Sequence, residues 1–309
     1  MVHFLQSPAW GDFQRSLGRE VVTDSGEGWS YLAVVERGKG NTRLYVPYGP
    51  VCQDETSFLA ALASLKQQAV QRKLTFIRIE PTATFSPLFL EKQGLKKVDY
   101  QHLQPEATRL IDLSRSEEDV LAAMSQNSRN LTRNYANKGL TISHSQRPED
   151  IDHLLNLLHA VAMRTGLRTH SDGYFRLQAK TLLDRGAATI YFANFDGQPV
   201  AAAMVYDDAE TRYYAHAAAD DTHRKLQAGT ALVGQMILDA KCMGKQQFDL
   251  YGITLSDDPT HPWAGFSRFK QSFGGKSVVY SGAYDVPLKP LPYALYRTYQ
   301  ELRARIRGK

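Results

Sequence analysis

The sequence is poor in cysteine and has no long run of apolar residues. Its only two cysteines, Cys52 and Cys242, lie far apart and match no CxxC or metal-ligand spacing. We therefore expect no disulfide and no metal site, and a reduced chain in which both cysteines are small core residues. No stretch approaches the roughly 18 apolar residues of a membrane-spanning helix, and Met1 to Leu5 contain no charged leader. We expect a soluble, uncleaved protein.

Several common catalytic motifs are also missing. The chain has no GxGxxG after a strand, no GxxxxGK[ST], no HExxH and no GxSxG. His216 and His261 are isolated and lack the spacing of a metal site. These absences disfavour redox, phosphate-binding-loop and metallohydrolase chemistry.

Positive charge is present but unevenly placed. The 309 residues have a net charge of +5, which favours a polyanionic partner. From Lys289 onward six basic residues oppose Glu301 alone, and a second basic cluster contains Arg129, Arg133 and Lys138. Either these clusters are solvated helix faces, or they contact the phosphates of a nucleic acid, a nucleotide or an anionic membrane.

The hydrophobic pattern predicts a similar order of elements twice. With 43% hydrophobic residues, the chain can form two domains of ordinary size. The first half is predicted to contain a hairpin, a helix, a strand and a helix, over residues 30–37 with 42–51, 56–73, 74–81 and 86–94. The second half is predicted to contain two helices, three strands, a helix and a strand, over residues 149–166, 173–186, 188–195, 198–208, 211–219, 226–244 and 247–253. Ser114 and Glu117 form a capping-box pattern, so we place the domain boundary near Leu113.

The turn RKLQAG, Arg224 to Gly229, lies between a predicted strand and a predicted helix. Such a turn can expose N–H groups at a helix N-terminus, where they bind pyrophosphate or another anion. It resembles the acyl-CoA loop of the Gcn5-related N-acetyltransferases, with Gln227 in place of the first glycine. An ordinary helix start explains the same pattern.

Polar and aromatic residues gather in the second half. Tyr214 and His216 alternate in a strand, so we expect both on one face, either closing a polar pocket or packing within the sheet. Tyr174 follows the polar run RTHSDG, in which Arg168 and His170 could bind a carboxylate or phosphate.

Two further stretches contain candidate catalytic groups. Glu80 ends the predicted strand 74–81, where it could accept a proton from an amine or pair with Arg78. The stretch HPWAGFSRFKQSFGG, residues 261–275, combines four aromatic residues with three glycines and a proline. We predict a bent loop there, held by its aromatic residues, with Lys270 at its centre.

These pieces together resemble the Fem (FemABX) aminoacyltransferases over nearly the whole chain. The matching segments are QSPAWGDFQ, YVPYGPV, IRIEP, QPEATRLIDLS, SRNLTRNYANKGL, FDLYGI and GFSRFKQSFGGKSVVYSGAYDVPLKPLPYALY. The resemblance implies an α/β (α+β) fold of two tandem Gcn5-related N-acetyltransferase-like domains. We assign residues 1–112 with 285–309 to the first domain and 113–284 to the second, with the C-terminal helix returning to the first. No heptad stretch long enough for a coiled-coil arm occurs.

The resemblance also implies a reaction. Fem enzymes transfer an amino acid from aminoacyl-tRNA to a stem-peptide amine of a peptidoglycan precursor, and so build the interpeptide bridge. The implied acceptor is lipid II or UDP-MurNAc-pentapeptide, and aminoacyl-tRNA is a co-substrate, with no other cofactor. We expect a cytoplasmic monomer with peripheral contact to the inner membrane surface, because the C-terminal segment is basic.

Residue by residue, the family's catalytic Phe-Lys pair falls on Phe269 and Lys270. A fixed ammonium would stabilise the oxyanion that forms when the amine attacks the aminoacyl ester. Phe269 would present a flat apolar wall to the terminal adenosine or the substrate. From its place at the end of a strand, Glu80 is the candidate base, with a proton relay by substrate groups as the alternative. The positions that match the family's substrate-binding residues, several with altered side chains, are Gln14, Tyr48, His170, Tyr174 and His216. Arg168 and Tyr214, which lie two residues before His170 and His216, are further binding candidates. Arg129 and Arg133 match its basic helix and would contact tRNA phosphates.

Two other functions fit the same residues. One is an acyl-CoA-dependent N-acetyltransferase that uses the RKLQAG turn. The other is a membrane- or nucleic-acid-associated binding protein built from inactive Gcn5-like halves.

Overall fold

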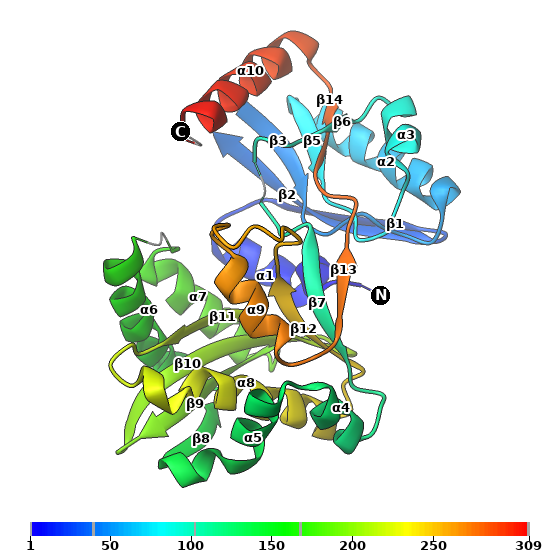
Figure 1. Ribbon diagram of the computed structural model, residues 1–309. Helices are drawn as coiled ribbons and strands as arrows, with labels where there is room; N and C mark the ends of the chain where they lie inside the picture. Colours follow the sequence, from blue (N-terminus) through cyan, green and yellow to red (C-terminus); the bar gives the residue numbers. More distant parts are fainter. Residues whose placement is uncertain (1, 39–40, 102, 167–168, 308–309) are drawn as a thin grey trace. The chain divides into compact units, whose positions relative to one another are not determined.

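The computed structural model describes residues 2–38, 41–101, 103–166 and 169–307 (Figure 1). The chain divides into two compact units. Unit 1 contains residues 1–106 and 279–309, and unit 2 contains residues 107–278. Arg168 lies outside the described residues. In the described part of the chain, no helix combines the length and hydropathy needed to cross a bilayer.

Unit 1 is a sheet with helices on both faces (Figure 1). Its strands are β1 (Val21–Gly26), β2 (Trp29–Gly38), β3 (Asn41–Val46), β4 (Val51–Cys52), β5 (Phe76–Ile79), β6 (Lys96–Lys97) and β14 (Tyr284–Pro287). Its helices are η1 (Phe4–Gln6), α1 (Pro8–Ser16), α2 (Glu55–Gln71), α3 (Pro87–Lys92) and α10 (Pro290–Arg307). The strand order is β1-β2-β3-β5-β14-β6, with β4 paired to β2, and the β3–β5 pair is parallel.

The alternation of side chains along β5 decides what each face of this sheet packs against. Ile77 and Ile79 face the main core, which α2 covers with Phe58 and Leu62. Phe76 faces the other way and packs against tyrosines of α10. The C-terminal helix therefore covers the second face of the unit 1 sheet.

Unit 2 is a second mixed sheet with helices on both faces (Figure 1). Its strands are β7 (Ala107–Asp112), β8 (Leu140–Ser145), β9 (Ala188–Phe195), β10 (Gln198–Asp207), β11 (Thr211–Ala219), β12 (Gln247–Gly252) and β13 (Lys276–Val279). Its helices are α4 (Glu117–Ala123), α5 (Gln126–Asn134), η2 (Tyr135–Lys138), η3 (Pro148–Asp150), α6 (Ile151–Thr165), α7 (Asp172–Leu183), η4 (Arg224–Leu226), α8 (Ala228–Cys242) and α9 (Ala264–Gln271). The strand order is β13-β7-β12-β11-β10-β9-β8, and β11 runs parallel to β12.

Small residues allow α8 to lie close to this sheet. Ala201, Ala203 and Val205 of β10 pack with Ala231 and Met236 of α8 in the main core of unit 2. The helices α6 and α7 lie over the opposite face (Figure 1). Among the described residues of unit 2 the longest helices, α6 and α8, have 15 residues each, too short for a two-helix arm.

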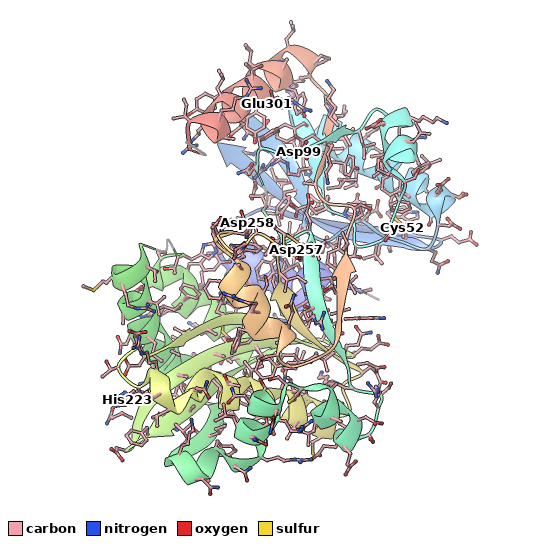
Figure 2. All side chains as sticks on the ribbon, in the orientation of Figure 1. Cys52, Asp99, His223, Asp257, Asp258 and Glu301 are labelled. Carbon is pink, nitrogen blue, oxygen red and sulfur yellow. The ribbon has the colours of Figure 1, made fainter. Side chains whose placement is uncertain are left out.

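Three expectations from the sequence need correction. The strand β7, residues 107–112, was predicted in the first domain but pairs with β12, because its apolar side chains complete the unit 2 core. The N-cap of α4 is Ser116, whose hydroxyl accepts from the Asp119 N–H, and not Ser114. Cys52, labelled in Figure 2, is half-buried, but Cys242 ends α8 and is exposed, so it is no core residue.

Candidate active site

The candidate site lies in unit 2, where two parallel strands separate. β11 and β12 are paired only from Thr211 to Tyr213 and from Gln247 to Asp249, although β11 continues to Ala219. Beyond that point the facing N–H and C=O groups of the two strands no longer bond to each other. Backbone polar groups that leave a ladder in this way need other partners, and they are available to side chains and ligands.

A bulge in β12 shapes the backbone at this opening. The pairing of β12 with β7 shifts between Asp249 and Gly252, and Tyr251 adopts a left-handed conformation with a φ of 62°. The Asp249 carboxylate accepts from the Tyr251 N–H at 2.6 Å and from the Thr108 hydroxyl. A short acidic side chain that bonds two residues ahead stabilises such a turn. Asp249 therefore holds the bulge.

The bulge presents a carbonyl to the predicted catalytic lysine. The Lys270 Nζ donates to the carbonyl of Gly252 at 2.6 Å. An ammonium has three N–H donors, so the same group can also donate to an oxygen of a substrate. Lys270 is half-buried and lies in the last turn of α9.

Burial and charge set the protonation of this pair. Burial lowers the pKa of Lys270 to about 8, and the charge of Asp249 opposes that shift. Burial raises the pKa of Asp249 to about 6, against the hydrogen bonds from Thr108 and Tyr251 and the charge of Lys270. Near neutral pH the lysine is mostly an ammonium and the aspartate mostly a carboxylate. Titratable groups with such shifts are typical of active sites.

The stretch around Lys270 is a short helix and not the predicted bent loop. α9 is anchored through Ser267, whose hydroxyl accepts from the Thr254 N–H at 2.9 Å. Phe269 packs against Phe273 with ring centroids 5.2 Å apart, and Phe273 is buried in the unit 2 core. Phe269 therefore helps to fix α9 on the core. Trp263, predicted as an anchor, is exposed.

The bend that the glycines indicated follows the helix. Gly274 and Gly275 have φ values of 82° and 76°, which favour glycine. A Cβ on Gly274 would lie 2.7 Å from the Ala123 oxygen, and one on Gly275 would collide with the carbonyl of Leu110. At these two glycines the chain turns from the end of α9 into the edge strand β13, close to the backbone of Ala123 and Leu110.

A cluster of rings in unit 2 brings three of the predicted binding residues together. His170 stacks on Tyr174 with centroids 4.0 Å apart, and Phe175 contacts His216 edge to face at 4.9 Å. The Tyr206 hydroxyl and His216 Nε2 are 2.8 Å apart. Burial lowers the pKa of His216 to about 3, so its imidazole is neutral at physiological pH.

The ring cluster and the lysine site border the same opening of the sheet. His216 lies on β11 beyond Tyr213, the last residue of that strand paired with β12. Gly252, whose carbonyl binds Lys270, lies on β12 beyond Asp249, the last residue of that strand paired with β11.

Tyr214 does not share a face with His216, in contrast to the sequence prediction. The pairing of β10 with β11 shifts so that Met204 opposes His216 and Val205 opposes Tyr214. Adjacent residues of β10 point to opposite faces, so a bulge at Ala215 separates the two side chains. Tyr214 accordingly packs against the core beneath α8, and His216 contacts α7.

The predicted residues of unit 1 are buried and bonded to residues of the same unit. Gln14 accepts from Arg19 Nη1 at 2.8 Å, and the Tyr48 hydroxyl donates to the carbonyl of Pro105 at 3.1 Å. Glu80 accepts from the Tyr45 hydroxyl at 2.5 Å, and burial raises its pKa to about 7. A carboxyl with this pKa can exchange a proton near neutrality.

Glu80 does not form the salt bridge weighed as the alternative to its role as a base. Arg78 binds Asp285 through two 2.8 Å bonds, and both side chains are fully buried. That pair holds β5 to β14, which form neighbouring strands of the unit 1 sheet.

The predicted basic cluster is divided between two roles. Arg129 and Arg133 lie one turn apart on α5, whose other face buries Leu131 and Thr132. Arg133 is exposed. Lys138 instead donates to the carbonyls of Lys225 and Leu226, so it supports the turn before α8.

The RKLQAG turn is a single 3-10 turn followed by the first turn of α8. Gln227 has a φ of 55°, the left-handed conformation that a glycine adopts without strain. No side chain caps the N-terminus of α8. The glycine-to-glutamine change therefore keeps the turn's backbone conformation.

Sequence reasoning missed Asp249 and Thr108, the two residues that hold the bulge. Both lie in segments that read as buried strands, and Thr108 is 140 positions away in the chain from the FDLYGI segment. The one available signal was the acid of FDLYGI, since a carboxylate within a buried strand needs partners.

The sequence and the fold of the chain are similar to those of known proteins. Residues 122–270 match the family described as acetyltransferase (GNAT) domain. No curated protein sequence matches the chain. Together with the division into two units and the likeness to a tandem GNAT structure described below, this match confirms the predicted fold class.

Solved structures of similar fold describe the fold of the chain more specifically. The chain has the fold of the crystal structure of FemX, with a TM-score of 0.86 and 16% sequence identity over 96% of this chain and 94% of that one. It is also similar to the C-terminal domain (DUF2156) of a putative lysylphosphatidylglycerol synthetase from Agrobacterium fabrum, with a TM-score of 0.64, 15% identity and coverage of 95% and 92%. A tandem GNAT protein from the clavulanic acid biosynthesis pathway gives a TM-score of 0.51, 13% identity and coverage of 90% and 94%.

Proposed function

We propose that this protein is an aminoacyltransferase that moves an amino acid from aminoacyl-tRNA to the stem-peptide amine of a peptidoglycan precursor, in the cytoplasm. The observation that carries the proposal is the Lys270 ammonium, held against the Gly252 carbonyl where β11 and β12 separate. The FemX-like fold and the FSRFKQSFGG segment support it.

The proposed chemistry is aminolysis of an ester. The acceptor amine attacks the aminoacyl carbonyl, a C–N bond forms, and the C–O bond to the tRNA ribose breaks. Negative charge grows first on the carbonyl oxygen and then on the leaving ribose oxygen, and Lys270 is placed to stabilise either. Overall the amine loses one proton and the ribose oxygen gains one. With a pKa of about 8, Lys270 can also pass that proton to the ribose.

Some of the other predicted residues take supporting roles in the proposal. His170, Tyr174 and His216 form the wall of rings that would orient the acceptor. Arg129 and Arg133 would bind phosphates of the tRNA. Glu80 stays a proposed base, because its pKa of about 7 suits proton exchange with an amine. We propose a monomer that needs no cofactor beyond its co-substrate.

One experiment tests this function directly. Radiolabelled Gly-, Ala- and Ser-tRNA are each incubated with UDP-MurNAc-pentapeptide or with lipid II, and the label in the acceptor is counted. Transfer from one donor, lost when the stem-peptide amine is chemically blocked, would support the proposal. Absence of transfer with all six pairs, using protein that unfolds cooperatively, would contradict it.

A second candidate function is acyl-CoA-dependent N-acetylation. The observations that favour it are the GNAT match over residues 122–270 and the uncapped start of α8 after Gln227. Titration calorimetry with acetyl-CoA separates the two functions. Binding at micromolar concentration together with failed aminoacyl transfer would favour acetylation. Salt-dependent tRNA binding without turnover would instead favour a non-catalytic binding protein.

A further inference from the structure

The C-terminal helix α10 has two apolar faces, and only one of them is buried. Tyr293 and Tyr296 pack against Phe76 in the unit 1 sheet. On the other side five large apolar residues are exposed to solvent. They are Leu291 (80% exposed), Leu295 (75%), Tyr299 (60%), Leu302 (53%) and Ile306 (75%).

These five residues form one continuous line. Starting from Leu291, successive members follow after four, four, three and four residues, which is the spacing of one helix face. Single exposed leucines are normal on a soluble protein, but a contiguous apolar stripe along most of an 18-residue helix marks a binding surface. We call it the α10 stripe.

Basic residues border the α10 stripe on both sides. Arg303 follows Tyr299 by four residues, and Arg305 follows Leu302 by three, so they rise from opposite edges of the stripe. The acid of this helix, Glu301, is labelled in Figure 2 and accepts from Arg297 at 2.6 Å, so its charge is compensated. The exposed face of α10 is therefore apolar at its centre and cationic at its edges.

We propose that the α10 stripe docks this protein on the surface of an anionic lipid bilayer. A helix with an apolar face and flanking arginines lies in the plane of the interface, with its leucines among the acyl chains and its arginines at the phosphates. A second copy of the chain is a poorer partner, since pairing two stripes would bring the arginine borders of both together. The proposal depends on unit 1 alone and stands or falls independently of the transfer reaction.

Vesicle co-sedimentation of the full chain tests the proposal. Vesicles of phosphatidylcholine alone are compared with vesicles that contain about 30% phosphatidylglycerol. We expect binding to the anionic vesicles that weakens as NaCl rises from about 0.05 to 0.5 M. The double variant Leu295→Glu/Ile306→Glu should lower the partition coefficient at least about tenfold, because it places charge at the centre of the stripe.

Matched variants make the result specific. Leu88 and Val70 are each 62% exposed elsewhere on unit 1. Leu88→Glu/Val70→Glu adds the same charge and should change the partition coefficient less than about twofold. Arg303→Glu/Arg305→Glu should remove the preference for anionic vesicles. All these sites are exposed, and thermal unfolding monitors the fold of each variant.

Three outcomes would overturn the proposal. The first is equal vesicle binding by wild type and the stripe variant. The second is equal loss in the stripe and control variants. The third is a dimer in sedimentation equilibrium that the stripe variant dissociates while vesicle binding is unchanged, which would make a second copy the occupant.

Discussion

Lys270 and Asp249 each favour the charged form of the other, while burial favours the neutral form of both. Their pKa values of about 8 and about 6 leave a window near neutrality in which both are charged. The Asp249 carboxylate also holds the bulge that supplies the carbonyl partner of Lys270. One side chain thus affects both the position and the protonation of the ammonium.

This relationship predicts a pH dependence. If the ammonium stabilises the transition state, kcat/KM should fall as the pH rises through about 8, where Lys270 loses its proton. Asp249→Asn removes the negative charge that favours the ammonium, so the pKa of Lys270 should fall further and the alkaline limb should move to lower pH. Transfer assays from pH 6 to 10 measure the limb. Asp119→Asn on exposed α4 should leave it in place, and a limb that Asp249→Asn leaves unmoved would exclude the coupling.

The role of Lys270 itself predicts opposite effects on activity and stability. Lys270→Met should lower kcat on the order of a hundredfold, because a transition-state charge loses its fixed cation. Burial lowers the pKa of Lys270 from 10.5 to about 8, so below about pH 8 the buried ammonium lowers the free energy of unfolding. Between pH 8 and 10.5 the folded protein binds fewer protons than the unfolded chain, and this cost disappears as the pH rises. The methionine variant should therefore unfold at an equal or higher urea concentration at pH 7. Lys276→Met, at an exposed site, should change neither quantity. Unchanged transfer in Lys270→Met would remove the proposed role.

The arginines of α5 predict a tRNA-specific defect. Arg129→Glu/Arg133→Glu should raise the KM for aminoacyl-tRNA at least about tenfold and reduce its dependence on salt, because two phosphate contacts are lost. The KM for the peptide acceptor should stay constant. Arg164→Glu/Arg185→Glu makes the same charge change at two other exposed sites of unit 2 and controls for net charge. A rise of equal size in both KM values would point to misfolding of unit 2.

Two glycines near α9 predict opposite effects on stability. Gly275→Ala should lower the free energy of unfolding by about 1–3 kcal/mol, since the new Cβ collides with the Leu110 carbonyl at a positive φ. Gly265→Ala should raise it by up to about 1 kcal/mol, because that position is helical with open space around it. Urea denaturation measures both. Equal effects of the two substitutions would contradict the packing described for this segment.

The buried ion pair of unit 1 predicts a large loss from a single truncation. Asp285→Ala should cost about 3–5 kcal/mol, because it leaves the fully buried Arg78 without its carboxylate. Asp152→Ala breaks the exposed pair with Arg176 and should cost less than about 1 kcal/mol. Denaturant titrations at pH 7 compare the two. A loss below 1 kcal/mol for Asp285→Ala would show that water or another group replaces the carboxylate.

Much of the fold could be predicted from local pattern. The nearly continuous apolar runs in residues 188–208 correspond to real strands, because β9 and β10 are buried on both faces. The helical spacing in 56–73 corresponds to a real helix, because it buries one face of α2. The structure of residues 261–275 was harder to predict from the sequence. Its glycines indicated a bend, but the bend follows Lys270 and the aromatic residues before it form α9, since short helices owe their stability to packing and not to propensity.

The sequence by itself determined the period of each element, the placement of positive charge and the candidate lysine, since these depend on residue type and spacing along the chain. Only the tertiary structure decided that Tyr214 and His216 point to opposite faces and that Asp249, Thr108 and Lys270 meet at one opening. The physical reason is that a bulge adds one residue to a strand and reverses every later side chain. Whether a bulge forms depends on partners distant in the chain.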